Sequence, residues 1–194
     1  MQILITGAAG FIGFNLSKYL LKKNIKVFGI DNINDYYSRS LKLDRIKELK
    51  KLKKFNFKKI DIRNEKKLSI FLKRKKIDVI IHLAAQAGVR YSLLNPTEFV
   101  QNNILGFYNV MNLAKINNIK KIFYASSSSV YGDSNNFPLK ENQIINPKNI
   151  YSLSKKNNEE MAEIFSKQFD IKLVGLRFFT IYGEWGRPDM FLMK

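Results

Sequence analysis

The chain has 194 residues, of which 45% are hydrophobic and 26% are charged, so it can bury the core of one ordinary domain. No apolar run approaches the roughly 18 residues of a membrane span, and strand-like sequence follows Met1 where a signal peptide would begin, so we expect a cytoplasmic protein. The absence of cysteine excludes disulfides and thiolate chemistry. The single histidine, His82, argues against a Ser-His-Asp triad or a histidine metal site. We expect no metal and a structural role for His82.

The net charge of +18 is concentrated in one stretch of the chain. Residues 42–76 contain 16 Lys or Arg against 4 Asp or Glu, a surplus of +12. This stretch is dominated by lysine, has no interleaved Arg and Gly, and matches no nucleic-acid-binding motif. Solvated helix faces explain the charge better than a nucleic-acid groove. We therefore expect neither a nucleic acid nor a membrane as partner.

Hydrophobic periodicity and chain breakers predict strands that alternate with helices. The expected strands are Ile3–Thr6, Lys26–Ile30, Phe55–Ile60, Asp78–His82, Lys121–Ala125 and Lys172–Leu176. The expected helices are Phe11–Lys23, Leu41–Leu52, Glu65–Lys75, Pro96–Asn118 and Tyr151–Phe169. The first helix is expected to bury Phe11, Ile12, Leu16, Tyr19 and Leu20. This alternation predicts an α/β fold, a Rossmann-type doubly wound parallel sheet with helices on both faces.

A glycine-rich turn directly follows the first strand and opens the first helix, in the sequence GAAGFIG at residues 7–13. Gly7 permits the tight turn, Gly10 lets the backbone approach a pyrophosphate, and Gly13 allows the helix to pack closely on the strand. The N-terminus of the helix then offers free N–H groups to phosphates. The turn predicts a dinucleotide site.

Asp31 follows the second strand, at the position that would accept hydrogen bonds from the adenosine ribose. A 2′-phosphate would meet like charge there, and Asn32-Ile33 follows instead of a basic pair. NAD is therefore favoured over NADP.

Two further groups of polar residues are candidates for chemistry. Tyr151 and Lys155 stand four residues apart, so both lie on one face of the predicted helix. A free tyrosine has a pKa of about 10, and a neighbouring cation together with an oxidised nicotinamide would favour the phenolate. Ser126–Ser129 end the fifth strand, where ligands bind in open parallel sheets, although four serines could also form only a polar loop.

Together these motifs resemble the extended short-chain dehydrogenase/reductase family of nucleotide-sugar epimerases and dehydratases, over essentially the whole chain. The likeness is most specific to the subgroup of UDP-glucuronate 4-epimerases. The motifs that carry it are residues 31–37, 82–92, 126–129, 176–180, 182–183 and 186–190. Members of the family are considerably longer, so the resemblance implies an NAD-binding domain at residues 1–177 and, at 178–194, only the start of a truncated substrate-binding region.

The resemblance implies that Tyr151 is the catalytic base, Lys155 its cationic neighbour and a ribose ligand, and Ser127 the hydroxyl that binds the sugar O4. Thr180 and Arg187 would hold the sugar carboxylate. The cofactor-binding residues implied by the turn and the resemblance are Gly7, Gly10, Phe11, Ile12, Gly13, Asp31, Asn32, Asp61, Ile62, Leu83, Ala84, Ala85, Tyr151, Lys155 and Phe178. The implied substrate-binding residues are Ser127, Ser128, Arg90, Asn103, Thr180 and Arg187, of which Asn103 would hold either substrate or structure.

The choice of reaction depends on the residues after Ser127. Related 4,6-dehydratases carry an Asp-Glu pair there, since elimination needs an extra acid and base, and decarboxylases that form UDP-xylose carry a glutamate in place of Ser129. This chain has Ser128 and Ser129. The resemblance therefore implies C4 epimerization of UDP-glucuronate to UDP-galacturonate through a 4-keto intermediate, in polysaccharide biosynthesis.

Two alternatives stay open. One is a 4-epimerase of an uncharged UDP-hexose, and the other is an NAD-binding fragment without activity. A homodimer and a separate C-terminal half are both open as partners besides the UDP-sugar.

Overall fold

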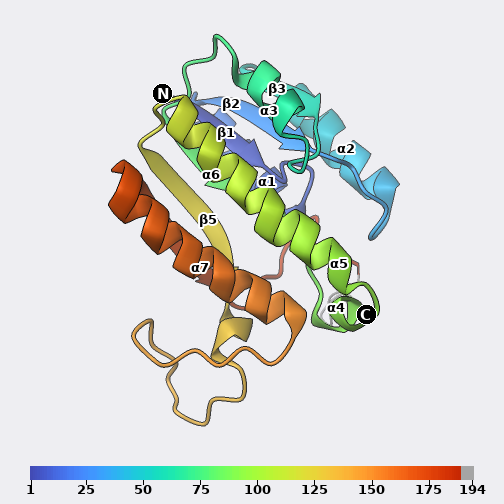
Figure 1. Ribbon diagram of the computed structural model, residues 1–194. Helices are drawn as coiled ribbons and strands as arrows, with labels where there is room; N and C mark the ends of the chain where they lie inside the picture. Colours follow the sequence, from blue (N-terminus) through green and yellow to red (C-terminus); the bar gives the residue numbers. More distant parts are fainter. Residues whose placement is uncertain (189–194) are drawn as a thin grey trace.

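A six-stranded sheet forms the centre of the computed structural model, which describes residues 1–188 (Figure 1). The strands are β1 Gln2–Thr6, β2 Lys26–Asp31, β3 Phe55–Lys59, β4 Val79–His82, β5 Lys121–Ser127 and β6 Lys172–Phe178. Their order is β3-β2-β1-β4-β5-β6, and every neighbouring pair is parallel. The order reverses between β1 and β4, and ligands of such sheets bind in the crevice at that point.

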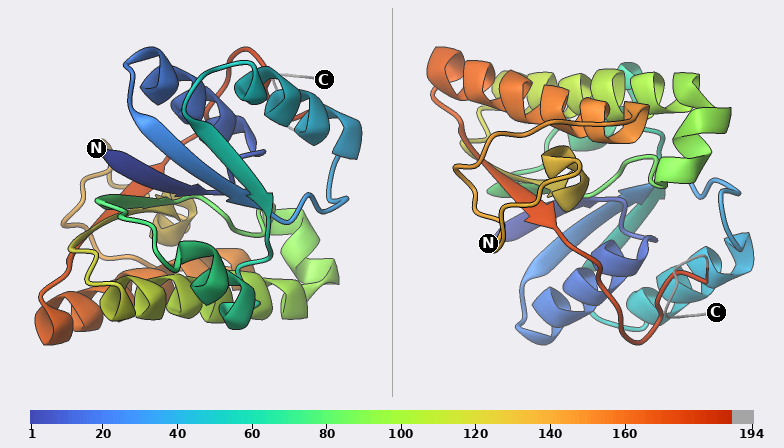
Figure 2. Two further views of the ribbon diagram at one scale, coloured as in Figure 1. Left: turned by 90° about the horizontal axis from the view of Figure 1, so that it is seen from above. Right: turned by 90° about the horizontal axis from the view of Figure 1, so that it is seen from below.

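Helices cover both faces of this sheet. They are α1 Phe11–Lys22, α2 Arg39–Lys50, α3 Glu65–Leu72, α4 Val89–Leu94, α5 Pro96–Phe99, α6 Gly106–Ile116 and α7 Ile150–Phe169, with a π-helical segment η1 at Val100–Leu105 and a 3₁₀ turn η2 at Ser128–Tyr131. The helices α1 and α2 pack on one face, and α3, α6 and α7 pack on the other (Figure 2). The predicted Rossmann-type fold is confirmed. None of these helices, within residues 1–188, is both long and apolar enough to span a bilayer.

Alternating side chains of β1 divide the core into two layers. Leu4 belongs to the cluster beneath α3, α6 and α7, whereas Ile3 and Ile5 belong to the cluster beneath α1 and α2. Successive side chains of a strand point to opposite faces, so a strand covered on both faces is apolar throughout. This burial fixes the carboxyl ends of β1 and β4, from which the site is built.

Two predictions about helices are wrong in detail. The expected buried residue Tyr19 is 58% exposed, because the buried stripe of α1 runs through Phe14, Ser17 and Leu21 instead. The expected continuous helix over residues 96–118 is interrupted by η1, and α4 precedes it where no helix was predicted. The wider π turn places Asn102 and Asn103 in buried polar surroundings. Hydrophobic periodicity does not distinguish such a π turn from a continuous α-helix.

Residues 179–188, which we call the strap, leave the carboxyl end of β6 and return to lie between α1 and α2 (Figure 2). The strap therefore crosses the sheet from the β6 edge toward the β2 side. Its path takes Thr180 and Arg187 past the crevice between β1 and β4. Asp189, Met190 and the rest of the predicted C-terminal region to Lys194 lie outside the described residues.

Candidate active site

A cavity of about 470 Å³ opens at the carboxyl edge of the sheet, where the strand order reverses. Its walls come from the turn after β1, the ends of β2 and β5, the loop after β4, the first turns of α7 and the strap. The predicted site residues that line it are Gly7, Gly10, Phe11, Ile12, Gly13, Asp31, Asn32, Ile62, Leu83, Ala84, Ala85, Ser127, Ser128, Tyr151, Lys155, Phe178, Thr180 and Arg187. Three predicted residues, Asp61, Arg90 and Asn103, are not among the lining residues.

The glycine turn leaves no room for side chains at two of its positions. A Cβ at Gly13 would lie 2.1 Å from the carbonyl oxygen of Gly7, and one at Gly7, whose φ is +72°, would lie 2.8 Å from the backbone nitrogen of Ala84. A Cβ at Gly10 would meet only the Gly7 oxygen, at 3.1 Å, and would otherwise enter the cavity. No side chain caps the N-terminus of α1, and its first turn has no acidic residue. The helix thus presents its positive end to the cavity, as a pyrophosphate requires.

Asp31 is held by the backbone at the end of β2. Its carboxylate accepts hydrogen bonds from the backbone N–H groups of Ala9, at 3.1 Å, and Ile33, at 2.8 Å. Burial raises the pKa of Asp31, while these two bonds and the nearby cations of Lys42 and Arg45 oppose that rise. The carboxylate is therefore tied directly to the glycine turn.

The three predicted residues outside the lining have other contacts. Asp61 accepts two hydrogen bonds from the Arg63 guanidinium and one from Asn32, while its neighbour Ile62 lines the cavity. Arg90 is exposed on α4. Asn103 is buried. Its Oδ1 accepts from the backbone N–H of Gln86 at 2.8 Å, and its Nδ2 donates to the carbonyl oxygen of Gln86 at 3.0 Å. Of the two roles expected for Asn103, these bonds serve the structural one.

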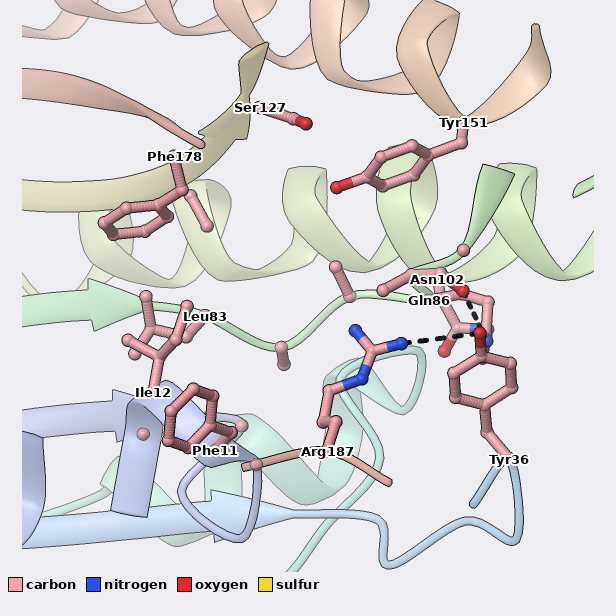
Figure 3. A pocket seen from close by; sticks show the side chains of 18 of the residues that line it. Phe11, Ile12, Tyr36, Leu83, Gln86, Asn102, Ser127, Tyr151, Phe178 and Arg187 are labelled. Atoms are coloured by element: carbon pink, nitrogen blue, oxygen red, sulfur yellow. Dashed lines mark hydrogen bonds between the residues drawn. The ribbon is translucent and has the colours of Figure 1, made fainter. Parts of the chain in front are cut away.

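Tyr151 stands in the first turn of α7, whose N-terminus is closed by a reciprocal pair of hydrogen bonds between Asn149 and Ser152. Figure 3 shows the hydroxyls of Tyr151 and Ser127 directed into the same space, with Arg187 on the opposite side of the cavity beside Tyr36. Burial raises the pKa of Tyr151, while hydrogen bonding to Ser127 and the charge of Arg187 lower it. A phenol, a hydroxyl and a cation thus converge on one volume.

Lys155 also reaches the cavity, and its ammonium is directed to the end of β5. Its Nζ is buried and donates to the carbonyl oxygen of Ala125 at 2.8 Å. Burial lowers the pKa of Lys155 to about 8. Within the described part of the chain, the groups that lower the pKa of Tyr151 are Ser127 and Arg187, and Lys155 lowers the pKa of His82 instead.

The Ser127 hydroxyl acts as a hydrogen-bond acceptor toward Ser129. Its Oγ accepts from both the backbone N–H and the Oγ–H of Ser129, at 3.2 and 2.8 Å. Its own proton is therefore left to donate outward. The four serines are more than a polar loop, because all of them line the cavity.

His82 ends β4 behind this site. It is buried, its Nδ1 lies 2.8 Å from the Oγ1 of Thr6, and burial together with the charge of Lys155 lowers its pKa to about 3. A neutral, buried imidazole of this kind matches the structural role that we expected.

The sequence did not assign a role to the aromatic pair Tyr36 and Tyr37, which also line the cavity. The Arg187 guanidinium lies 5.4 Å from the ring centre of Tyr36 and 5.9 Å from that of Tyr37, and it donates to the Tyr36 hydroxyl at 3.5 Å. Both tyrosines belong to the motif at residues 31–37, but the contact joins residues 151 positions apart. Local spacing could not have revealed it.

The chain is similar to known proteins over nearly its whole length. The model of the NAD dependent epimerase/dehydratase family matches residues 3–194. Protein CapI of Staphylococcus aureus is 48% identical over 100% of this chain and 58% of its own length. UDP-glucuronate 4-epimerase 4 of Arabidopsis thaliana is 43% identical over 98% of this chain and 44% of its own length. The chain spans about half the length of the curated relatives it matches.

Solved structures show the same likeness. The UDP-glucuronic acid 4-epimerase of Bacillus cereus, in complex with UDP-glucuronic acid and NAD, superposes with a TM-score of 0.92 at 37% identity. The match covers 100% of this chain and 61% of that chain.

Proposed function

Because this chain belongs to the NAD dependent epimerase/dehydratase family, we propose that it is the cofactor-binding and catalytic part of a UDP-glucuronate 4-epimerase. The broader class, an NAD-dependent UDP-sugar 4-epimerase, is supported by relatives of that description. The observation that carries the finer proposal is the convergence of Tyr151, Ser127 and Arg187 on the cavity that the glycine turn opens. Polysaccharide biosynthesis is the setting that the same resemblance suggests.

The cofactor is NAD, because the family is NAD dependent and solved relatives hold NAD. The residues present fit it. The glycine turn and the N-terminus of α1 would hold the pyrophosphate, and Asp31 would accept the adenosine ribose hydroxyls. Asn32 and Ile62 line the cavity beyond Asp31, where the adenine would follow. When bound, NAD takes up a hydride from the sugar and gives it back.

The residues of this chain supply the proton transfer and the orientation. The deprotonated Tyr151 Oη takes the proton of the sugar C4 hydroxyl as C4 is oxidised to a ketone, and it returns that proton to O4 when C4 is reduced from the other side. Ser127, whose Oγ accepts from Ser129 and whose own proton is directed to the cavity beside Tyr151, would hold O4 throughout. Positioned groups of this kind contribute through proximity and general acid–base catalysis.

Within residues 1–188, no second acid lines the cavity near the reacting carbon. Among residues 1–188, Asp31 is the only carboxylate that lines it, and Asp31 is bonded to the glycine turn and not to the region of Tyr151. Ser128 and Ser129 occupy the wall where elimination would require an acid and a base. This supports epimerization over dehydration.

An Arg187→Ala variant is expected to bind UDP-glucuronate about 10- to 100-fold more weakly, because it loses a charge-assisted hydrogen bond to the sugar carboxylate. Thr180, on the same strap, would share that carboxylate. Binding of UDP-glucose, which has no carboxylate, should change little. Titration calorimetry with both nucleotides in the presence of NAD measures the difference. An equal loss for the two nucleotides would remove Arg187 from carboxylate recognition.

The whole proposal is tested by incubating the purified chain with NAD and UDP-glucuronate and separating UDP-galacturonate by chromatography. Formation of the epimer supports it. Inversion of UDP-glucose at an equal or higher rate would make the chain an epimerase of uncharged sugars. Binding of NAD without any turnover would make it an NAD-binding fragment without activity. Adding a separately expressed C-terminal half would then show whether a partner restores activity.

A further inference from the structure

Arg45 of α2 is a fully buried cation whose hydrogen bonds to residues 1–188 all go to uncharged oxygens. Its exposed fraction is 0%, and it donates to the carbonyl oxygens of Ala9 at 3.0 Å, Trp185 at 2.5 Å and Gly186 at 3.2 Å, and to the Tyr37 hydroxyl at 2.6 Å. Burying a charge is costly unless hydrogen bonds compensate it. The role of this buried guanidinium should therefore lie in the segments of the chain that its hydrogen bonds join.

The four acceptors belong to three separate parts of the molecule. Ala9 is in the glycine turn, Trp185 and Gly186 are in the strap, and Tyr37 is one of the two rings beside Arg187. One guanidinium thus joins the cofactor-binding turn to a segment that follows it by more than 170 residues in the sequence. The planar fork of arginine can serve several acceptors at once, which a lysine ammonium on the same stem does not match.

Other contacts of the strap are consistent with a fixed docking position. The Trp185 ring packs on Phe14 of α1 with their centres 5.2 Å apart, and Asn15 of α1 donates to the Glu184 carbonyl oxygen at 3.3 Å. Arg187 follows directly after Gly186, one of the carbonyl groups that Arg45 holds. The docked strap therefore carries Arg187 to its place beside Tyr36 (Figure 3).

We propose that Arg45 is a positioning residue, which fixes the strap on the cofactor-binding turn and so places Arg187 over the substrate side of the cavity. Arg45 itself does not line the cavity. The consequence for substrate rests on the proposed function, whereas the docking of the strap does not. The two parts can be tested separately.

The docking is tested by the fluorescence of Trp185, which is the only tryptophan of the chain. An Arg45→Lys variant keeps the charge and most of the size but loses the fork, so we expect its emission to shift to longer wavelength and its quenching by acrylamide to increase. Arg45→Met should show the same changes more strongly. Lys47→Met, an exposed position on the same helix with the same loss of charge as Arg45→Met, should leave both signals unchanged.

Far-ultraviolet circular dichroism shows whether each variant is folded. A folded Arg45→Lys or Arg45→Met chain with the wild-type emission and quenching would overturn the proposal. Unfolding of both variants would also overturn it, because Arg45 would then be a general part of the core and not a specific anchor of the strap.

The consequence for substrate is tested on the folded variant with NAD present. Arg45→Lys should weaken binding of UDP-glucuronate, by at most the loss expected for Arg187→Ala, and should leave UDP-glucose binding nearly unchanged. An equal loss for both sugars would contradict placement of Arg187 by Arg45. If the wild-type chain binds no UDP-sugar at all, the proposed function fails, and the fluorescence result still decides whether Arg45 docks the strap.

Discussion

A Tyr151→Phe variant is expected to bind NAD as the wild-type chain does but to invert UDP-glucuronate at C4 about 10²- to 10⁴-fold more slowly, the usual contribution of a positioned general base. The phenyl ring fills the same space, and its packing against Phe99, with ring centres 6.0 Å apart, is retained. Only the Oη that would accept the sugar proton is removed. The measurement is the rate of formation of the C4 epimer, with NAD affinity determined in parallel.

Tyr19→Phe is the matched control, because Tyr19 is exposed on α1 and is not a lining residue of the cavity. The pH dependence supplies a second criterion. Burial raises the pKa of Tyr151, and the reaction needs the deprotonated form, so the wild-type rate should rise with pH toward that pKa. Ser127→Ala removes a contact that lowers the pKa of Tyr151 and should move the rise to higher pH. An undiminished rate in Tyr151→Phe would exclude Tyr151 as the base.

The parts of the site that the sequence predicted are those built by residues close together in the chain. The glycine turn needs only the spacing of Gly7, Gly10 and Gly13 after a strand, and the sharing of one helix face by Tyr151 and Lys155 needs only a separation of four residues. In both cases local backbone geometry determines where the groups lie. Because the predicted sheet is parallel, the carboxyl ends of β1, β2 and β5 lie at the same edge, and the groups that follow these strands come together there.

The parts that the sequence did not predict depend on contacts between distant segments. The return of the strap to α2 through Arg45, and the placing of Arg187 beside Tyr36, join residues that are 140 or more positions apart. The direction of the Lys155 ammonium likewise depends on a carbonyl group of β5, 30 residues earlier. Charge and hydropathy patterns carry no information about which distant oxygen a cation will reach.

The π turn η1 shows the same limit within a single helix. Residues 96–118 have helical periodicity, but Asn103 must face Gln86 and the Ser154 hydroxyl at 3.0 Å, and the extra residue of the turn accommodates this. Such turns are frequent at functional sites. Here the turn ties the loop that lines the cavity to α7, the helix that carries Tyr151.

A Lys155→Met variant is expected to lose stability relative to the wild-type chain as pH rises, because methionine removes a buried charge that destabilises the wild type only while Lys155 is protonated. Burial lowers the pKa of Lys155 from 10.5 to about 8 in the folded chain. Between these two values the unfolded chain binds one proton more than the folded chain, so the free energy of unfolding of the wild type rises with pH. Below pH 8 both states are protonated, and the buried charge destabilises the fold by roughly 3 kcal/mol.

Methionine removes that charge at similar length, but it also leaves the Ala125 carbonyl oxygen without the Lys155 donor, at a cost of about 1–3 kcal/mol. The two effects partly cancel at pH 7, whereas only the loss of the donor remains near pH 10. Urea unfolding of both chains at the two pH values should therefore show the variant losing roughly 3 kcal/mol relative to the wild type as pH rises. Lys167→Met, exposed on the same helix, separates this effect from that of net charge. A stability difference independent of pH would show that the Lys155 ammonium is solvated, and its place beside the site would have to be abandoned.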